Sequence, residues 1–380
     1  MSIDLEKVNQ RQEVLAKDRA IPWLTKLLAK MNDFGTVSDK EKIFFTQNLQ
    51  VMIRSGLPLD RSLKTLAEQI NNKKFKKIIG DLAANTEKGI AFTESLSKYE
   101  EVFGHLFISM VQAGEISGRL EDVLKQIYLQ IKKAHELKSR IIGAMIYPVI
   151  VIVAMVLIGI GMMIFVVPKI TAIFVEMKAE LPLPTKVLIG LSDFILNNGF
   201  LTGLAAVLLI GLIIYTIKNE KTKYYYHYVF LKLPILGPIV KKINLAKFAR
   251  TLSSLLKTDI ALVKSFEITA QILGNRLYRR SLLSSLNDLK EGISLTAVLQ
   301  KYPDLYPPVI IQMVAAGEET GLVDEILTDL ADFHEEEIDQ IMKTLPTVIE
   351  PVLLLILGAG VGAMAVAIIM PMYSLTEHIS

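Results

Sequence analysis

The stretch 110-MVQAGEISGRLEDVL-124 returns later in the chain as 313-MVAAGEETGLVDEIL-327. The match continues without a gap on both sides of these two stretches. Aligned pairs outside them include Phe45 with Phe248, Leu49 with Leu252, Gly89 with Gly292, Tyr99 with Tyr302, Pro148 with Pro351, and Pro168 with Pro371. Chance does not keep register over such a span, so the sequence indicates a tandem duplication of one unit.

In each copy, the repeated stretch predicts a tight corner between two helices. Gly114 and Gly317 tolerate a positive φ, so we expect the first helix to end just before them. Ser117 and Thr320 are placed to cap the second helix, and the acids that follow favour its positively polarised first turn. The residues predicted to build the two corners are Gly114, Ser117, Gly118, Gly317, Thr320 and Gly321.

The composition is too apolar for a wholly soluble protein. Of the 380 residues, 51% are hydrophobic, and the mean hydropathy is +0.41. Part of the chain is therefore expected to meet lipid. The formal net charge of +3 gives no case for binding nucleic acid. Cysteine is absent, which excludes disulfides and thiolate metal sites.

Three apolar runs are long enough to cross a bilayer as helices, which takes about 20 residues. They are residues 141–167, 199–217 and 347–371, the last with an uncharged centre at 352–370. Lysine and arginine cluster just before the first run and just after the second. By the positive-inside tendency, we expect the N-terminus and both soluble stretches in the cytoplasm, and the loop 168–198 and the tail 372–380 outside.

The duplication explains why the number of runs is odd. Each copy is a soluble stretch followed by one membrane crossing, so the first copy leaves the chain on the far side of the membrane. The middle run belongs to neither copy and brings the chain back. Two copies in the same orientation require such an additional crossing.

Helical periodicity in the soluble stretches predicts short amphipathic helices and no strands. The first bundle is expected over residues 38–140, opening at a capping box from Ser38 to Glu41. The second, with a basic linker before it, is expected over residues 218–346, with Asp259 where the first copy has Gly56. The predicted fold class is an all-α membrane protein, with two tandem cytoplasmic six-helix bundles and three transmembrane helices.

The leader, residues 1–37, contains an amphipathic stretch at 21–31 with Trp23 on its apolar face. It lacks the apolar core of a secretory signal. One interpretation is a helix that packs on its own bundle. The other is a helix that lies at the membrane interface or docks on a partner.

Two pairs of aligned residues leave two interpretations open. Pro148 and Pro351 lie near the cytoplasmic ends of the first and third runs, where they predict either a fixed bend or a moving hinge. Glu115 and Glu318 follow the corner glycines and are predicted to face solvent. They either compensate a helix dipole or bind a partner protein.

No constellation of catalytic residues is apparent in the sequence. The five histidines are scattered, and the phosphate-loop, dinucleotide-binding and nucleophile-elbow motifs are missing. The acidic run at residues 334–339 is interpreted as a solvated helix face rather than a cation site. We therefore predict no catalytic, cofactor-binding or metal-binding residue, and a protein that is not an enzyme.

The motifs resemble those of the type II secretion system F domain family, the inner-membrane platform proteins of type II secretion and type IV pilus machines. The resemblance rests on FFTQNLQVMIRSGLPLDRSL at residues 44–63 and on the Gly-Glu-x-[Ser/Thr]-Gly corners at 114–118 and 317–321. It covers roughly residues 39–168 and 244–371.

The resemblance implies a non-enzymatic role in the bacterial cytoplasmic membrane. Expected partners are a hexameric assembly ATPase, other inner-membrane scaffold proteins, pilin or pseudopilin subunits, membrane lipid, and further copies of the chain in a dimer or higher homo-oligomer. The platform is expected to transmit ATPase motion to the subunits that enter a fibre. Neither a cofactor nor nucleic acid is implied.

Two other classes of function compete with this interpretation. A small transporter, or another polytopic scaffold built from parallel repeats, would also contain tandem copies. Against the transporter, the runs lack a central ionisable residue for a coupling ion. A membrane-bound enzyme ranks third, because no catalytic constellation is found.

Overall fold

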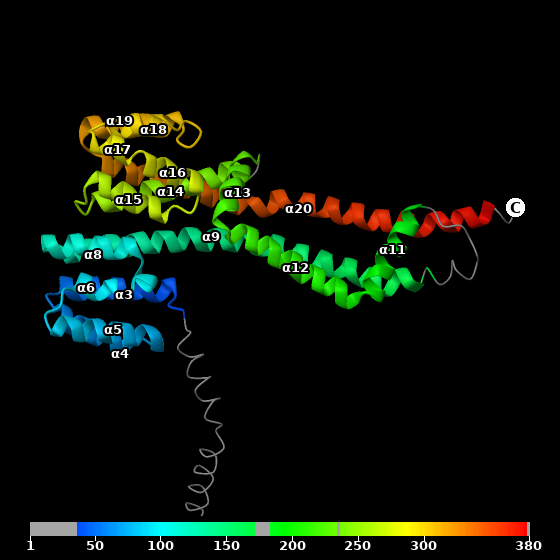
Figure 1. Cartoon of the computed structure of the whole chain (residues 1–380), viewed down its shortest axis with the longest axis horizontal. Coiled ribbons are helices and arrows are strands. Elements are labelled where there is room, and N and C mark those ends of the chain that lie inside the picture. Colours follow the sequence, from blue (N-terminus) through cyan, green and yellow to red (C-terminus); the bar gives the residue numbers. More distant parts are fainter. Residues whose placement is uncertain (1–35, 170, 172–182, 234–235, 378–380) are drawn as a thin grey trace, which may run out of the picture. The chain divides into compact units, whose positions relative to one another are not determined.

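The computed structural model describes residues 36–169, 171, 183–233 and 236–377 (Figure 1). Within these ranges the regular structure is helical and no strand forms. This confirms the all-helical class that the periodicity predicts. The amphipathic stretch at 21–31 lies outside the described residues.

The first copy opens at the predicted capping box. The Ser38 N–H donates to Glu41 Oε2 at 2.7 Å, and the Glu41 N–H donates to Ser38 Oγ at 3.3 Å. In residues 38–140 we find seven helices rather than six, because the short piece before α8 divides into α6 and α7. The helices are α3 (Asp39–Arg54), α4 (Leu59–Gln69), α5 (Lys73–Glu87), α6 (Phe92–Ser97), α7 (Glu100–Phe103), α8 (His105–Ser117) and α9 (Leu120–Gly161).

The second copy repeats this order with two differences. The residues 303–306, which align with α7, form no helix. The residues that align with α5 are divided at Ser285, whose hydroxyl donates to the Ser281 carbonyl at 2.8 Å. Such bonds compete with the backbone ladder of a helix. The helices are α14 (Leu236–Leu256), α15 (Leu262–Ile272), α16 (Arg276–Ser284), α17 (Leu286–Lys290), α18 (Leu295–Gln300), α19 (Pro308–Thr320) and α20 (Val323–Glu377).

The last helix of each copy continues without a break from the bundle into an apolar segment (Figure 1). α9 passes through Pro148 and a π-helical turn, η1 (Met162–Val166), and α20 passes through Pro351. In the described residues, two helices are long and apolar enough to cross a membrane, namely Leu120–Lys169 and Val323–Gly362. The first contains the first predicted run, and the second contains residues 347–362 of the third.

Between the copies lie three further described helices. These are α11 (Leu183–Asn197), α12 (Gly199–Lys218) and α13 (Glu220–Lys232). α12 coincides with the middle apolar run, and its crossing of the membrane stays a prediction. At the other end, residues 372–377 of the predicted external tail continue the helix α20.

The first compact unit crosses the boundary between the copies, because it joins the first copy to residues 251–272 of the second. Its core contains the buried apolar residues of α3, α4 and α5. Leu255 and Ile268, from α14 and α15, belong to the same apolar cluster and are completely buried. The first bundle is therefore completed by a helix pair from the other copy.

The second compact unit holds the rest of the second copy. Three buried aromatic rings form its centre: Tyr306 lies 5.4 Å from Phe248 and 5.7 Å from Tyr278, measured between ring centroids. In the first copy the aligned residues Phe45, Phe75 and Phe103 pack in the same way, with centroids 5.6 to 6.1 Å apart.

One tyrosine hydrogen bond is kept in both copies although its acceptor changes. The Tyr99 hydroxyl donates to Asp81 Oδ2 at 2.7 Å, and the aligned Tyr302 hydroxyl bonds to Ser284 Oγ at 2.6 Å. Partial burial and the bond to the Asp81 carboxylate raise the pKa of Tyr99 to about 12. The tyrosine ties the segment after α6 or α18 to α5 or α16.

Candidate functional site

In both corners the first helix ends later than expected. This holds for the corner between α8 and α9 and for the matching corner between α19 and α20. α8 runs through Ser117, and the positive φ falls on Gly118, at 69°. In the second copy it falls on Gly321, at 73°. Each of these glycines caps the first helix in the left-handed conformation, which glycine adopts without steric penalty.

Gly114 and Gly317 have another role, which is to let two helices approach closely. Both are helical and buried. A Cβ built on Gly114 would lie 2.9 Å from the Cβ and Cγ2 atoms of Val123, and one built on Gly317 would lie 3.2 Å from the Val323 Cα. A side chain at either position would therefore push the second helix away from the first.

The prediction that Ser117 and Thr320 cap the second helix is wrong. The Ser117 hydroxyl donates backwards to the Ala113 carbonyl at 2.8 Å, and the Thr320 hydroxyl donates to the Ala316 carbonyl at 2.7 Å. Because the first helix is longer than expected, both residues belong to its last turn. They bond the carbonyl four residues earlier in the chain.

Glu115 and Glu318 each hold the start of a short helix. Glu115 accepts hydrogen bonds from the Phe92 N–H at 2.7 Å, the Thr93 N–H at 2.9 Å and the Thr93 hydroxyl at 2.6 Å. Partial burial disfavours the charged form, but these bonds outweigh it, so the pKa of Glu115 lies below its ordinary value. Glu318 makes the same three bonds with the backbone of Leu295 and with Thr296.

This arrangement gives both glutamates a structural contact. Their side chains are partly buried rather than facing solvent, and they tie α8 to α6 and α19 to α18. The first turn of a helix has unpaired N–H groups, which a carboxylate can accept. A role in partner binding stays a prediction.

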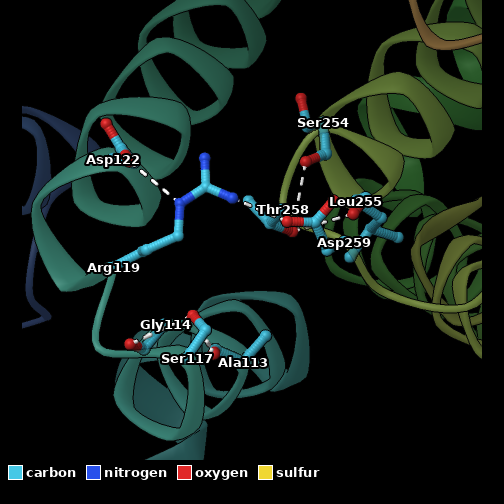
Figure 2. Close-up of polar contacts among 9 residues, drawn as sticks. All are labelled: Ala113, Gly114, Ser117, Arg119, Asp122, Ser254, Leu255, Thr258 and Asp259. Carbon is cyan, nitrogen blue, oxygen red and sulfur yellow. Dashed lines mark hydrogen bonds and ion pairs between the residues drawn. The ribbon is translucent and has the colours of Figure 1, made fainter.

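A second contact, which the sequence analysis does not predict, joins the corner of the first copy to the second copy within the first compact unit. Figure 2 shows Arg119 pointing toward Asp122 and Asp259. Its guanidinium lies 3.2 Å from Asp122 Oδ2 and 2.7 Å from Asp259 Oδ2. Asp259 has a φ of 58°, the left-handed conformation that Gly56 has in the first copy.

Further along the same contact, Gln130 of α9 is buried and bonds to two residues of α14. Its amide Nε2 donates to Thr251 Oγ1 at 3.1 Å, and its Oε1 accepts from Ser254 Oγ at 3.0 Å. A buried amide requires such partners, because leaving it unpaired costs about 1–3 kcal/mol. α15 also contacts α8, close to the buried Ile268.

The acidic run at residues 334–339 is not a solvated face throughout, which corrects the expectation. His334 and Glu335 are buried, and Arg250 lies 2.9 Å from Glu335 Oε1 and pairs with Asp332. Lys242 pairs with Glu337. The sequence did not reveal these pairs, because the basic partners lie on α14, far from the acidic run along the chain. Among the described residues, no group of three or more potential ligands could hold a metal ion.

The second unit also contains an apolar cavity of about 840 Å³ between α13, α14, α19 and α20. Leu245, Ile310 and Leu330 line its apolar wall, with Phe333 among the other lining residues. The charged residues of the lining are Lys232, Lys241, Lys242, Asp329 and Glu337. The lining is predominantly apolar.

The structure therefore defines a class: a membrane protein built from two tandem helical copies, each continuing into an apolar helix long enough to cross a bilayer. This chain belongs to the family described as type II secretion system (T2SS), protein F, which matches residues 45–168 and 248–371. The two matches coincide with the two copies found by internal alignment.

Curated relatives support this assignment. The chain is 30% identical to the type IV pilus assembly protein PilC of Myxococcus xanthus, covering 100% of this chain and 91% of the relative. It is 32% identical to the protein of the same name from Thermus thermophilus, covering 90% and 84%. It is 29% identical to the type II secretion system protein F of Vibrio cholerae, also covering 90% and 84%.

Proposed function

We propose that this chain is the inner-membrane platform protein of a type IV pilus or type II secretion machine. The observation that carries the proposal is the family match of both copies, together with the names of relatives that span nearly the whole chain. The proposed role is non-enzymatic: the bundles receive force from a hexameric cytoplasmic ATPase, and the membrane helices pass it to pilin or pseudopilin subunits entering a fibre.

The continuous helices α9 and α20 support this role. Each joins a buried core to an apolar segment without a loop between them. A helix transmits displacement along its axis, whereas a flexible linker would absorb it. We place three crossings in the inner membrane, with the N-terminus and both bundles in the cytoplasm and the end of α20 outside. Pro148 and Pro351 would set the angle of the first and third crossings, because each removes a backbone hydrogen bond.

The test combines assembly with co-purification. In cells from which the gene has been removed, fibres or secreted substrate should be lost and should return with the unaltered chain. The restored protein should co-purify with a hexameric ATPase in detergent. Normal fibres without the chain, or solute flux through reconstituted protein that never binds an ATPase, would contradict the proposal.

The orientation can be tested separately with alkaline phosphatase, which is active only outside the cytoplasm. Fusions within the bundles, after residues 135 and 340, should be inactive, and a fusion after residue 377 should be active. The first two fusions serve as controls for the third, since all three carry the same reporter. Activity at residue 135 or 340 would overturn the proposed topology.

A further inference from the structure

The contact between the copies joins two different faces of the repeated unit. We define the corner face as the surface around Arg119 and Gln130 in the first copy. We define the opening face as the surface around Thr251, Ser254 and Asp259 in the second copy. An interface between two different faces is heterologous, so a pair joined once leaves one face of each kind without this contact among the described residues. We call these two the unused faces.

The unused corner face belongs to the second copy. Leu322 aligns with Arg119, and Phe333 aligns with Gln130. Whereas Gln130 is buried, Phe333 is 56% exposed and Leu322 is 46% exposed. Large apolar side chains at these positions indicate a surface that a partner covers.

The unused opening face belongs to the first copy. Val51 aligns with Ser254, and Leu57 aligns with Ile260, which packs against the core of the first unit. Val51 is 40% exposed and Leu57 is 45% exposed. At the positions of Gln130 and Ser254, the unused faces therefore expose an apolar side chain where the used faces are buried. Arg119 and Asp259 are themselves exposed, with 54% and 75% of their side chains accessible.

The two unused faces differ from the used ones in a matched way. The internal contact pairs Gln130 with Ser254 through a hydrogen bond. The aligned pair, Phe333 and Val51, is apolar on both sides. At this pair a polar residue has become apolar on both sides, while Asn48, which aligns with Thr251, stays polar. The paired change keeps these two positions complementary to each other.

Charge complementarity points to the same pairing. Along α20, the exposed acids Glu325, Asp329 and Glu336 lie on the side of the helix that carries Phe333. Around Leu57, the exposed bases are Arg54, Arg61 and Lys64. Opposite charges around an apolar centre orient two surfaces and exclude wrong pairings.

We propose that the chain associates head to tail with further copies of itself. The corner face of the second copy in one molecule binds the opening face of the first copy in the next, with Phe333 against Val51 and Leu322 against Gly56. Because the interface is heterologous, it builds a ring or a row of molecules in the plane of the membrane rather than a closed two-fold pair.

The first test is chemical cross-linking, which is specific because the chain contains no cysteine. Val51→Cys and Phe333→Cys are made in separate full-length chains, which are mixed in detergent and treated with a short bismaleimide. A disulfide is not expected, because in the internal contact Gln130 reaches Ser254 through the full length of its side chain. The mixture should give a cross-linked heterodimer, and neither variant should do so alone.

Leu283→Cys is the matched control, because Leu283 is 41% exposed on α16 and lies on neither face. Mixed with Val51→Cys, it should give no cross-link. If Val51→Cys or Phe333→Cys cross-links with itself, the interface is two-fold and the proposal is wrong. The proposal is equally wrong if no mixture cross-links.

The second test uses complementation. Val51→Glu places an acid opposite the acids of α20, and Phe333→Lys places a base opposite the bases around Leu57. Each variant alone should shift from oligomer to monomer mass. The mixture should recover a dimer or a longer oligomer, because it holds one unaltered pair of faces and one pair with opposite introduced charges. Monomers in the mixture, or oligomers of either variant alone, would overturn the proposal. Thermal unfolding of each variant excludes a folding defect.

These experiments use the purified chain and need neither ATPase nor fibre. A negative result would leave the proposed platform function standing. Loss of the platform function would likewise leave the cross-linking result intact.

Discussion

The two copies share a backbone plan but differ in the chemistry of their cores. The first copy packs Phe45, Phe75 and Phe103, and the second packs Phe248, Tyr278 and Tyr306 at the aligned positions. The two tyrosines are accommodated because each hydroxyl has a partner: Tyr278 donates to the Leu305 carbonyl, and Tyr306 bonds to Ser281. The fold thus fixes the shape of a core position, while its polarity depends on the neighbour.

The largest difference between the copies is expected when alanine replaces the buried corner glycine. Gly114→Ala should destabilise the fold by about 2–3 kcal/mol, because its Cβ meets the rigid Cβ of Val123 at 2.9 Å. Gly317→Ala should cost about 1 kcal/mol, because its nearest contacts begin at 3.2 Å. Thermal unfolding of the full chain in detergent measures both.

Gly80→Ala is the control, since Gly80 is helical in α5 and a Cβ there meets nothing within 4 Å. It should be neutral or stabilise by up to about 1 kcal/mol, the helix preference of alanine over glycine. Equal losses for Gly114→Ala and Gly317→Ala would show that the two corners are equally tight.

Exchanging the core aromatics should produce the next largest effect. Phe103→Tyr should cost about 2 kcal/mol, because it buries a hydroxyl opposite Ile78, which stands where the second copy has Ser281. Tyr306→Phe should cost only about 1 kcal/mol, because Ser281 keeps its bond to the Tyr278 carbonyl. Denaturant unfolding of Phe103→Tyr, of Ile78→Ser and of the double variant gives the coupling energy between the two positions. A coupling energy near zero would contradict this account.

The glutamates that hold α6 and α18 should behave alike. Glu115→Gln and Glu318→Gln should each cost about 1 kcal/mol, as expected for a lost helix cap. The pKa of Glu115 is lowered by folding, so its contribution is present above the pKa of the unfolded chain and is lost as pH falls through the folded pKa. The difference between the unaltered chain and Glu115→Gln should therefore shrink in acid.

The same variants test the partner hypothesis. Reversal of both charges with Glu115→Lys and Glu318→Lys should lower the unfolding temperature if the role is structural. Unchanged stability together with loss of fibre assembly would instead indicate that a partner binds these carboxylates.

The smallest effect is expected in the turn between α14 and α15, the first two helices of the second copy. Asp259→Gly removes an exposed ion pair with Arg119 but relieves a left-handed conformation, so the change should stay within about 0.5 kcal/mol. Arg119→Ala, measured by thermal unfolding, is the matched control. A loss well above 1 kcal/mol for Asp259→Gly would show that the pair contributes more than its exposure allows.

The sequence predicts the duplication, the helical class and the capping box at Ser38, because these depend on local pattern. It assigns the wrong glycine to the left-handed cap, because both Gly114 and Gly118 fit the motif and only packing against Val123 separates them. It also misses the contact between the copies. Two signals could have found it: Gln130 on the apolar stripe of α9, and Asp259 where a glycine is expected.

The basic partners of residues 334–339 were missed for a related reason. Arg250 and Lys242 lie far away in the chain, and no local period links them to Glu335 and Glu337. Periodicity identifies which face of a helix is polar. It does not tell whether that face meets water or an oppositely charged helix.

The place of Leu255 and Ile268 in the core of the first unit has a consequence for biosynthesis. The ribosome makes these residues only after the apolar segment of α9 has emerged, so the N-terminal bundle stays unfinished while the nascent chain is being inserted. A fragment that ends before α14 would expose the apolar surface that Leu255 and Ile268 cover in this bundle. If α9 crosses the membrane as proposed, its insertion can therefore begin before the domain that is translated first is complete.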